Sequence, residues 1–379
     1  MPVPRQKNLF GIVVSPSLEE RLHLLAEDSR YDLAGSCAKD PSGRGRRRGS
    51  FGRWIYPVVL PSGRQMTLFR ILLTNVCVND CAYCPLRSDR DPRRVSLRPE
   101  ELARAFMSYW RQKLVQGLFL SSGVVKDPDT TMELLLRTAQ ILREKEGFGG
   151  YLHLKVIPGA SKAAVEEAAR LADALSLNLE APKKQYFTLL SQRKRFEDLI
   201  TLSRYLAQLK ESFKFSHTTQ LVVGAAGESD EDLIRITEAL YHKLGLNRVY
   251  FSAYQPGCGR PELPGETLAR RLDLRTREHR LYQVDFLLRR YGFKAQEIPL
   301  VNGFLDLEID PKTAWARAHP EFFPVNVNRA SYEELLRVPG IGPTLAKRIL
   351  KLRRQRRLRD LSGLGPESFI SRARPYVSY

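Results

Sequence analysis

The sequence predicts an α/β fold: a partial (β/α)6 barrel followed by a small all-α C-terminal domain. Three observations support this. From about residue 66, short apolar runs with strand character alternate with segments of helical periodicity. Six such runs fit an open barrel better than a closed barrel of eight strands. After Pro324 the composition changes, and residues 324–379 contain 12 Lys and Arg against 4 Asp and Glu.

Residues 1–65 are expected to hold one helix and one basic arm. Residues 17–29 (SLEERLHLLAEDS) place apolar side chains three or four positions apart, which predicts a short amphipathic helix. The segment Gly43–Arg53 then holds five arginines and no acid. We expect Arg46, Arg47 and Arg48 to contact nucleic-acid phosphates, with a solvated loop as the alternative.

The barrel is expected over residues 66–305. Its predicted strands are 67–74, 118–121, 151–156, 175–180, 219–223 and 248–254. Predicted helices lie between them, for example over 99–115, 130–145 and 161–173. This alternation favours parallel strands with right-handed crossovers. Ligands in such folds bind at the carboxyl ends of the strands, so motifs there are the candidate functional residues.

The rest of the chain is expected to be a linker with a short helix (306–323) and a basic domain (324–379). The whole chain of 379 residues has a formal net charge of +19. Such a charge favours a polyanionic partner, nucleic acid above all, with a merely soluble basic protein as the alternative. No uncharged apolar run approaches the ~20 residues needed to span a bilayer. The N-terminus lacks a signal-peptide core, so we expect a cytoplasmic protein without a membrane partner.

Three of the five cysteines lie close together in Cys77-Val-Asn-Asp-Cys81-Ala-Tyr-Cys84, directly after the first predicted strand. Three thiolates at these spacings can wrap a loop around one face of an iron–sulfur cube and leave one iron open to a ligand. A Cys3His zinc site is the alternative. No histidine lies between His23 and His153, which favours the cluster.

This C-x3-C-x2-C motif, with Tyr83 before its last cysteine, resembles that of the radical S-adenosylmethionine (SAM) superfamily. The resemblance implies a [4Fe-4S] cluster on Cys77, Cys81 and Cys84, whose open iron chelates the amino and carboxylate groups of SAM. It also implies an electron donor such as flavodoxin or ferredoxin. One-electron reduction would cleave SAM to methionine and a 5′-deoxyadenosyl radical, which abstracts a substrate hydrogen.

The same resemblance assigns SAM contacts to Tyr83 and to residues near the strand ends. Ser121-Ser122-Gly123 stands where the superfamily usually has Gly-Gly-Glu, which contacts the methionine amine; the serine pair departs from that pattern. Glu180 stands where a polar residue commonly holds the ribose hydroxyls, with a simple strand end as the alternative. Lys155 and Gln220 are expected to face the pocket, and a surface salt bridge is the alternative for Lys155.

The C-terminal domain carries a helix–turn–helix pattern. Ser331 and Glu334 form a predicted capping box, and the helix that they open ends at the turn Val338-Pro-Gly-Ile-Gly-Pro343. Gly340 and Gly342 allow a close approach to a partner. The N–H groups at the start of the next helix, near Thr344, suit a phosphate.

This pattern resembles the helix-hairpin-helix motif, in tandem with a less complete second hairpin at Gly363-Leu-Gly365. The resemblance implies sequence-independent binding to the backbone of duplex DNA. The expected DNA contacts in this domain are Gly340, Gly342, Thr344, Lys347 and Arg348. The predicted basic helix Lys347–Arg359 favours nucleic acid over the alternative, a protein-docking module.

The whole chain resembles one family, the DNA modification/repair radical SAM proteins. The segments that carry the resemblance are 31–37, 71–84, 117–135, 153–160, 218–230, 277–293 and 310–330. It implies a partner similar to uracil-DNA glycosylases, beside which members are usually encoded. The family tends to show Ser-Cys-Ser-Ser around Cys37, where this chain has Gly35-Ser36-Cys37-Ala38. That thiol is a candidate hydrogen-atom donor or ligand to an accessory metal, with a small buried hydrophobe as the alternative.

We therefore expect an enzyme that holds DNA and performs radical chemistry on one nucleotide, in either repair or modification. A buried cluster requires that nucleotide to leave the duplex stack. The first alternative is an RNA substrate, as in tRNA-modifying radical SAM enzymes. The second is a non-catalytic DNA-bound iron–sulfur protein that senses redox state or recruits a partner.

Overall fold

The computed structural model describes residues 6–7, 13–14, 16–29, 55–59 and 65–379. Cys37, Arg46, Arg47 and Arg48 lie outside the described residues, so the roles expected for the thiol and the arginine arm stay predictions. The chain divides into two compact units. One holds residues up to 228 together with 240–274, and the other holds 229–239 together with 275–379.

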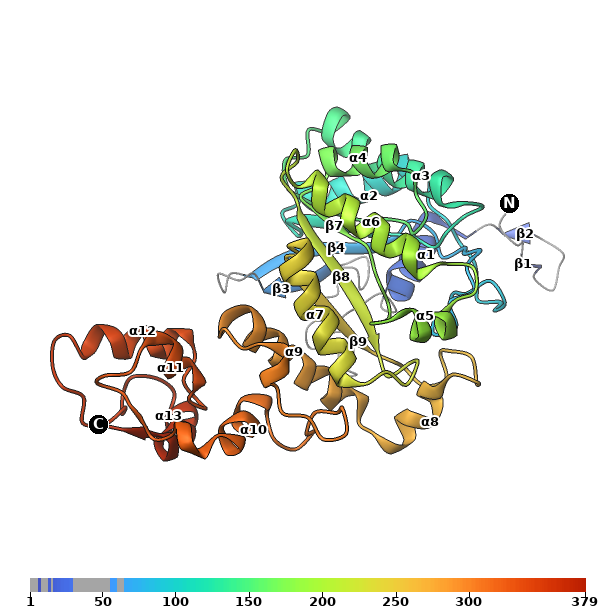
Figure 1. Ribbon diagram of the computed structural model, residues 1–379. Coiled ribbons are helices and arrows are strands. Elements are labelled where there is room, and N and C mark those ends of the chain that lie inside the picture. The colour runs from blue at the N-terminus through green and yellow to red at the C-terminus, as the bar shows by residue number, and fades with distance from the viewer. Residues whose placement is uncertain (1–5, 8–12, 15, 30–54, 60–64) are drawn as a thin grey trace. The chain divides into compact units, whose positions relative to one another are not determined.

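The first unit is built on a seven-stranded sheet with the order β3-β4-β5-β6-β7-β8-β9 (Figure 1). Its strands are β3 (Ile55–Val59), β4 (Gln65–Leu72), β5 (Gly117–Ser121), β6 (Tyr151–Lys155), β7 (Ala174–Ser176), β8 (Ser216–Val223) and β9 (Arg248–Ala253). The six strands from β4 to β9 run parallel, which confirms the predicted partial (β/α)6 barrel.

Two strands differ from the sequence prediction. β3 falls in the predicted N-terminal arm but pairs antiparallel with β4, at the edge of the sheet, where its Pro57 is tolerated. The strand predicted over 175–180 ends at Ser176. Glu180 has a φ of 65°, in the left-handed region that a strand excludes, and it rejoins the sheet only as an isolated bridge to Leu221.

The outer face of the sheet is mostly apolar and is buried. Its side chains include Phe69, Ile71, Leu118, Leu120, Leu152, Leu154, Leu175, Leu221, Val249 and Phe251. The helices of this unit are α1 (Leu18–Asp28), α2 (Pro99–Arg111), α3 (Pro128–Gln140), α4 (Lys162–Leu171), α5 (Lys184–Leu190), α6 (Phe196–Leu209) and α8 (Pro264–Arg271). Helices α2, α3, α4 and α6 pack as successive neighbours (Figure 1). Helix α1 confirms the short helix predicted over 17–29, and Ser17 and Glu20 form a capping box at its start.

The second unit contains the C-terminal hairpins. Its helices are α9 (Leu274–Arg290), α10 (Pro311–Ala318), α11 (Tyr332–Arg337), α12 (Pro343–Leu352) and α13 (Glu367–Ala373), and α7 (Asp230–Leu244) begins in this unit and ends in the first. The predicted basic helix Lys347–Arg359 is therefore too long, because α12 ends at Leu352. Two short strands that the sequence did not predict, β10 (Val325–Asn326) and β11 (Val377–Ser378), pair in parallel.

The predicted linker 306–323 does contain a short helix, α10, but it is packed rather than extended. Lys312 of α10 is buried and its Nζ donates to the carbonyl of Ile341, 2.5 Å away. Trp315 of α10 packs edge-on against Phe293, and the Arg337 guanidinium lies 3.9 Å from the centre of the Phe293 ring. These contacts join the linker to the hairpin domain within the second unit.

Candidate active site at the carboxyl ends of the strands

The three cysteines lie on the loop that follows β4, at the carboxyl end of the sheet. Backbone N–H groups orient two of their sulfurs: Val124 donates to Cys77 Sγ and Leu86 to Cys84 Sγ, each at 3.4 Å. Cys81 is buried, whereas Cys77 and Cys84 are half-buried. Hydrogen bonds to sulfur tune the potential of an iron–sulfur cluster, so both bonds suit cluster ligands.

The three sulfurs share one electrostatic environment. Burial raises the pKa of the Cys84 thiol, and the neighbouring Cys81 and Cys77 raise it further because thiolates repel one another. Burial also raises the pKa of the Cys81 thiol, and the nearby Lys194 ammonium opposes that rise. The three sulfurs are close enough for their thiolates to repel one another. Binding to the irons of a cluster would offset that repulsion, because a cluster binds all three as thiolates.

The arrangement does not suit a single metal ion. Within the part of the chain that the structure describes, no three His, Cys, Asp or Glu side chains converge on one point where an ion would bind. A zinc ion needs its ligands at about 2.0–2.3 Å from one centre. In an iron–sulfur cube the cysteines bind separate irons, so Cys77, Cys81 and Cys84 need no such convergence.

Two predicted SAM contacts, Tyr83 and Glu180, lie beside the cysteine loop and touch each other. Burial raises the pKa of Tyr83 well above its ordinary value, and the Glu180 carboxylate, which shares a hydrogen bond with Tyr83, adds to that rise. The backbone of Glu180 is fixed on both sides, because its N–H donates to Gln220 and its carbonyl accepts from Val222. The positive φ thus turns a buried carboxylate toward the cysteine loop at a strand end.

Sequence reasoning missed Lys194, which completes this group. Burial alone would lower the pKa of its ammonium, but the charges of Cys81 and Glu180 outweigh burial and raise it. Lys194 follows α5 in the chain and belongs to none of the sequence motifs. No local pattern points to Lys194; the structure brings its segment to the cysteine loop through Asp80, the acid between the first two cysteines.

Asp80 ties the cysteine loop to the segment that carries Lys194. Its carboxylate accepts from the Ser191 hydroxyl at 2.6 Å and from the Gln192 N–H at 2.9 Å. Nearby, the Ala82 N–H donates to the Leu190 carbonyl at 2.7 Å. These bonds fix the loop and the Lys194 segment as one piece of structure.

The segment Ser121-Ser122-Gly123 runs alongside the same loop. The Gly123 N–H donates to the Thr74 carbonyl and the Val78 N–H donates to the Val124 carbonyl, both at 2.8 Å. A Cβ at Gly123 would lie 2.3 Å from the carbonyl oxygen of Val76, closer than any side chain tolerates. Glycine is therefore required here so that the two backbones can meet beside Cys77.

Lys155 and Gln220 lie on the face of the sheet opposite the helices. Lys155 pairs in register with Ser176, and Gln220 pairs with Tyr250. Both positions alternate with fully buried leucines of the outer face, Leu154 and Leu221. Both residues therefore lie on the inner face of the sheet, and the SAM contacts expected of them stay predictions.

The loop after β9 also packs against the cysteine loop. The Arg260 N–H donates to the Ala82 carbonyl at 2.7 Å, and the Arg260 guanidinium pairs with Asp89 at 2.9 Å. Arg87 donates to the Cys258 carbonyl at 3.0 Å. The loop over 77–84 is therefore braced by segments that follow three other strands, β5, β7 and β9.

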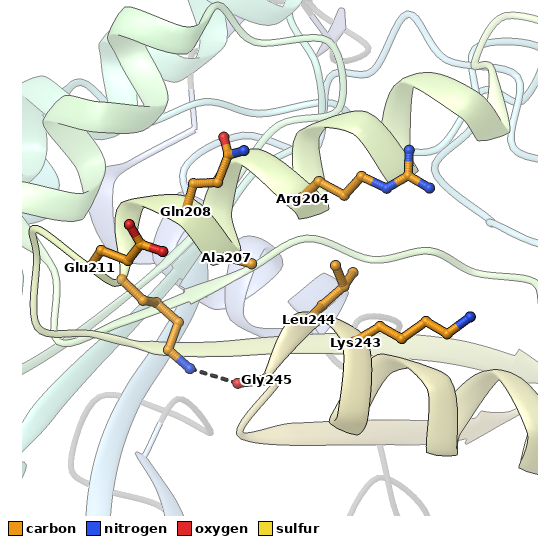
Figure 2. Close-up of a pocket in the computed structure, with 8 residues that line it drawn as sticks. Arg204, Ala207, Gln208, Glu211, Lys243, Leu244 and Gly245 are labelled. Atoms are coloured by element: carbon orange, nitrogen blue, oxygen red, sulfur yellow. Dashed lines mark hydrogen bonds between the residues drawn. The ribbon is translucent and has the colours of Figure 1, made fainter.

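A surface pocket of 580 Å3 lies elsewhere in this unit, between the ends of α6 and α7 (Figure 2). Its cations include Arg204, Lys210 and Lys243. Lys210 donates to the Gly245 carbonyl at 2.6 Å, and to the side chain of Asn247 just before β9 at 3.2 Å. The pocket therefore borders the amino ends of the strands, the opposite edge from the cysteines, and Lys210 is occupied in closing the end of α7.

In the hairpin domain, the first turn has the conformation that its glycines predict. Gly340 has a φ of 82°, and a Cβ there would lie 2.1 Å from the Phe369 carbonyl oxygen. Gly342 is the N-cap of α12, and Thr344 and Lys347 are exposed on that helix. Among the predicted DNA contacts of this domain, Arg348 is the one bound to the protein, since it donates to the Leu364 carbonyl at 2.8 Å.

The same kind of hydrogen bond is found inside both hairpin turns. Ile341 is the second residue of Gly-Ile-Gly-Pro, and Leu364 is the second residue of Gly-Leu-Gly-Pro. The carbonyl of each accepts from a cation of a preceding helix, Lys312 in the first case and Arg348 in the second. A trans peptide holds C=O and N–H on opposite sides, so each bond also turns the following glycine N–H away from that cation.

The family comparisons agree with this geometry. Residues 71–240 match the family model of the radical SAM superfamily. The chain contains a radical SAM domain. Radical SAM domains use a [4Fe-4S] cluster and SAM, the two cofactors expected from the cysteine motif. Residues 322–377 match the helix-hairpin-helix motif.

The radical SAM domain also has similarities to individual proteins. Threonylcarbamoyladenosine tRNA methylthiotransferase MtaB of Thermotoga maritima is 24% identical over 214 residues, which cover 55% of this chain and 49% of that protein. The chain thus spans about half the length of this curated relative.

Solved structures match over a similar share of the chain. Methylornithine synthase (PylB) is 16% identical, with a TM-score of 0.47 over 58% of this chain and 62% of that one. The FeFe-hydrogenase maturase HydG of Carboxydothermus hydrogenoformans is 14% identical, with a TM-score of 0.47 over 58% and 51%. Among the described residues, no helix is long and apolar enough to cross a membrane.

Proposed function

We propose that this protein is a radical SAM enzyme that acts on one nucleotide of DNA, in repair or modification. The observation that carries the proposal is the presence, in one chain, of a radical SAM match over 71–240 and a helix-hairpin-helix match over 322–377. The hairpin domain supplies a basic surface for backbone phosphates, since residues 324–379 hold 12 Lys and Arg against 4 Asp and Glu.

The residues of the radical SAM domain have distinct roles in this proposal. Cys77, Cys81 and Cys84 would hold the cluster, which together with SAM supplies a carbon-centred radical able to remove a hydrogen atom. Glu180, with Tyr83 hydrogen-bonded to it, presents a buried carboxylate suited to ribose hydroxyls. The Lys194 ammonium is suited to the carboxylate of SAM and, in its absence, is balanced by Glu180.

The nucleotide must enter the radical SAM domain as a single unstacked unit. Unstacking costs least at a damaged or mismatched base, which favours a lesion as the natural substrate. The resemblance seen in the sequence adds two partners to the proposal: a protein similar to uracil-DNA glycosylases, which exposes damaged sites, and a flavodoxin or ferredoxin as electron donor.

A tRNA substrate is the second candidate. One observation favours it: the 24% identity over 214 residues to a tRNA methylthiotransferase. That similarity covers 55% of this chain.

The test is SAM cleavage under anaerobic conditions. The reconstituted, reduced protein is given SAM with no nucleic acid, with intact duplex DNA, with duplexes carrying single lesions, or with tRNA, and 5′-deoxyadenosine is quantified. We expect one duplex to raise the yield at least tenfold, and the Cys81→Ala variant to form none. Stimulation by tRNA alone would mean that the substrate is RNA and not DNA. No stimulation by any nucleic acid, with an intact cluster, would contradict both candidates.

A further inference from the structure

The inner face of the half-barrel, opposite the helices, is polar. Two register rows define it. Arg70, Phe119, His153, Ala174 and Ser216 form one row across β4 to β8. Two residues further toward the carboxyl ends, Lys155, Ser176, Thr218 and Arg248 form a second row across β6 to β9. Buried parallel strands are ordinarily apolar on both faces, so a polar inner face calls for a reason.

The charged residues that the six parallel strands contribute to this face have one sign. The six parallel strands contain no Asp or Glu, and their Lys and Arg residues are Arg70, Lys155 and Arg248. All three belong to the two inner-face rows. A chamber lined by charge of one sign concentrates ions of the opposite sign. The chemistry of this face therefore favours an anionic ligand.

Aromatic rings hold two of the cations in place. The Arg70 guanidinium lies 4.3 Å from the centre of the Phe119 ring, its partner in the row. The Arg248 guanidinium lies 5.5 Å from the centre of the Tyr250 ring, two residues along β9. A guanidinium stacked on a ring keeps its N–H donors at its rim, in the plane that pairs with phosphate oxygens.

Two hydroxyls lie between the cations of the second row. Ser176 and Thr218 are register partners, with Lys155 on one side and Arg248 on the other. They are 6% and 5% exposed. Neither Ser176 Oγ nor Thr218 Oγ1 has a hydrogen-bond partner within the described residues. Buried hydroxyls are ordinarily satisfied, so this pair indicates a ligand that is bound when the protein functions.

Resting on the proposed function, we propose that the inner face binds the phosphate of the target nucleotide. Lys155 and Arg248 flank that phosphate, so Lys155 takes this ligand in place of the SAM contact expected from the sequence, and Ser176 and Thr218 donate hydrogen bonds to it from between them. Arg70 belongs to the first row, which lies two residues, or about 7 Å, nearer the amino ends of the strands than the second row. It adds positive charge on that side of the phosphate. The substrate class is thus a nucleoside phosphate unit, bound with its sugar and base toward the cysteine loop.

The test is equilibrium binding to the full chain with its cluster and SAM present and no reductant, so that no turnover is needed. The probes are the four deoxynucleoside 5′-monophosphates, their nucleosides, a dinucleoside phosphate and inorganic phosphate. We expect at least one phosphate-bearing nucleotide to bind tenfold or more tightly than its nucleoside. A free monophosphate and the dinucleoside phosphate distinguish a mononucleotide substrate from a polymer.

Variants locate the binding. Arg248→Met and the double variant Ser176→Ala/Thr218→Val should each lose at least fivefold in nucleotide affinity and little in nucleoside affinity. The double variant should also melt at the same or a higher temperature, because it removes unsatisfied buried hydroxyls; a merely structural role would lower that temperature. Arg104→Met, on the exposed side of α2, is the matched control and should bind as the parent does.

The possible failures are distinguishable. Equal affinity for nucleotide and nucleoside, or unchanged binding in Arg248→Met, would overturn this inference even if DNA stimulates SAM cleavage. Conversely, nucleotide binding that depends on these residues would uphold it even if neither DNA nor tRNA stimulates cleavage, and only the proposed function would then fail.

Discussion

At the scale of single residues, the site depends on close backbone contacts that only certain residues permit. Gly123 shows this most clearly, because the Cys77 loop and the segment after β5 meet where a side chain would be. Glu180 is the converse case, a residue with a side chain held at a φ of 65°, where glycine would be easier. The backbone of Glu180 is strained, yet it places a carboxylate beside Tyr83 and Lys194, which indicates a function for the carboxylate itself.

Gly123→Ala should therefore impair cluster assembly. The new Cβ would lie 2.3 Å from the Val76 carbonyl oxygen, and one of the two backbones must move, displacing Cys77. We expect the iron content after anaerobic reconstitution to fall to less than half that of the parent, measured together with sulfide and the visible absorption of the cluster.

Gly149→Ala is the matched control for this change. A Cβ at Gly149 meets nothing within 4 Å, and its φ is not in the left-handed region. This variant should load iron fully and be as stable as the parent or slightly more so, by about 0.4–1 kcal/mol. Full iron loading in Gly123→Ala would show that the close approach beside Cys77 is not required.

The residue scale also shows what a sequence can reveal. Cys77, Cys81 and Cys84 are recognisable because all three ligands lie in one short segment. Lys194 is far from them in the sequence and is brought to Cys81 by tertiary contacts without a local pattern, such as the bond between Asp80 and Ser191. Long-range contacts of this kind are set by the packing of the whole sheet.

At the scale of elements, capping and alternation were predictable, whereas element ends and packing were not. Ser331 caps α11 through Glu334 as its sequence predicts, because that bond is local. The predicted helix Lys347–Arg359 ends early, since the cluster of arginines after Leu352 has no apolar face to bury. In the sequence, Lys312 looks like an ordinary surface residue of α10. In the structure it is buried beneath the first hairpin turn.

The buried Lys312 should make the stability of the second unit depend on pH. Burial, opposed by the charge of Asp310 and assisted by that of Arg337, lowers the pKa of its ammonium from 10.5 to about 7. Between these two values the unfolded chain binds more protons than the folded one, so stability rises with pH across that window. The slope is at most about 1.4 kcal/mol per pH unit.

Urea-dependent proteolysis at pH 7, 8 and 9, read by cleavage within 275–379, measures this effect. Lys312→Met should show a flatter pH dependence than the parent, because it has no proton to release. Lys347→Met, at an exposed position of α12, should keep the slope of the parent. Parallel pH profiles for Lys312→Met and the parent would contradict the expected deprotonation.

At the scale of the whole molecule, the radical SAM match gives the class of enzyme, and the helix-hairpin-helix match and the net charge support the proposed nucleic-acid partner. The net charge of +19 and the family matches could be recognised from the sequence, because they depend only on composition and local motifs. The positive inner face of the half-barrel was not, because it exists only once six separate strands are in register. Lys155 and Gln220 were predicted to face a pocket, but the charge of the inner face and its unsatisfied hydroxyls emerge only from the register of the strands.

If nucleic acid binds through phosphates, its affinity must fall with salt in proportion to the number of phosphates neutralised. Removing one cation that neutralises a phosphate should reduce the slope of log K against log salt by about 0.9 on duplex DNA. Lys347→Met should therefore reduce the slope by about that amount. Changing Arg46, Arg47 and Arg48 to Gln together should reduce it by as much as three times that amount. Lys312→Met should lower affinity without altering the slope, because Lys312 is buried beneath the first hairpin turn and contacts no phosphate itself.

Anisotropy titrations at four salt concentrations, on a duplex and on tRNA, separate these contributions. A slope that changes for the arginine triple variant but not for Lys347→Met would place the DNA contact on the N-terminal arm and leave the hairpins as a docking module. The reverse would assign it to the hairpins. Since Arg104→Met removes one positive charge that belongs to neither segment, a slope change in that variant would mean that total charge, and no particular surface, holds the nucleic acid.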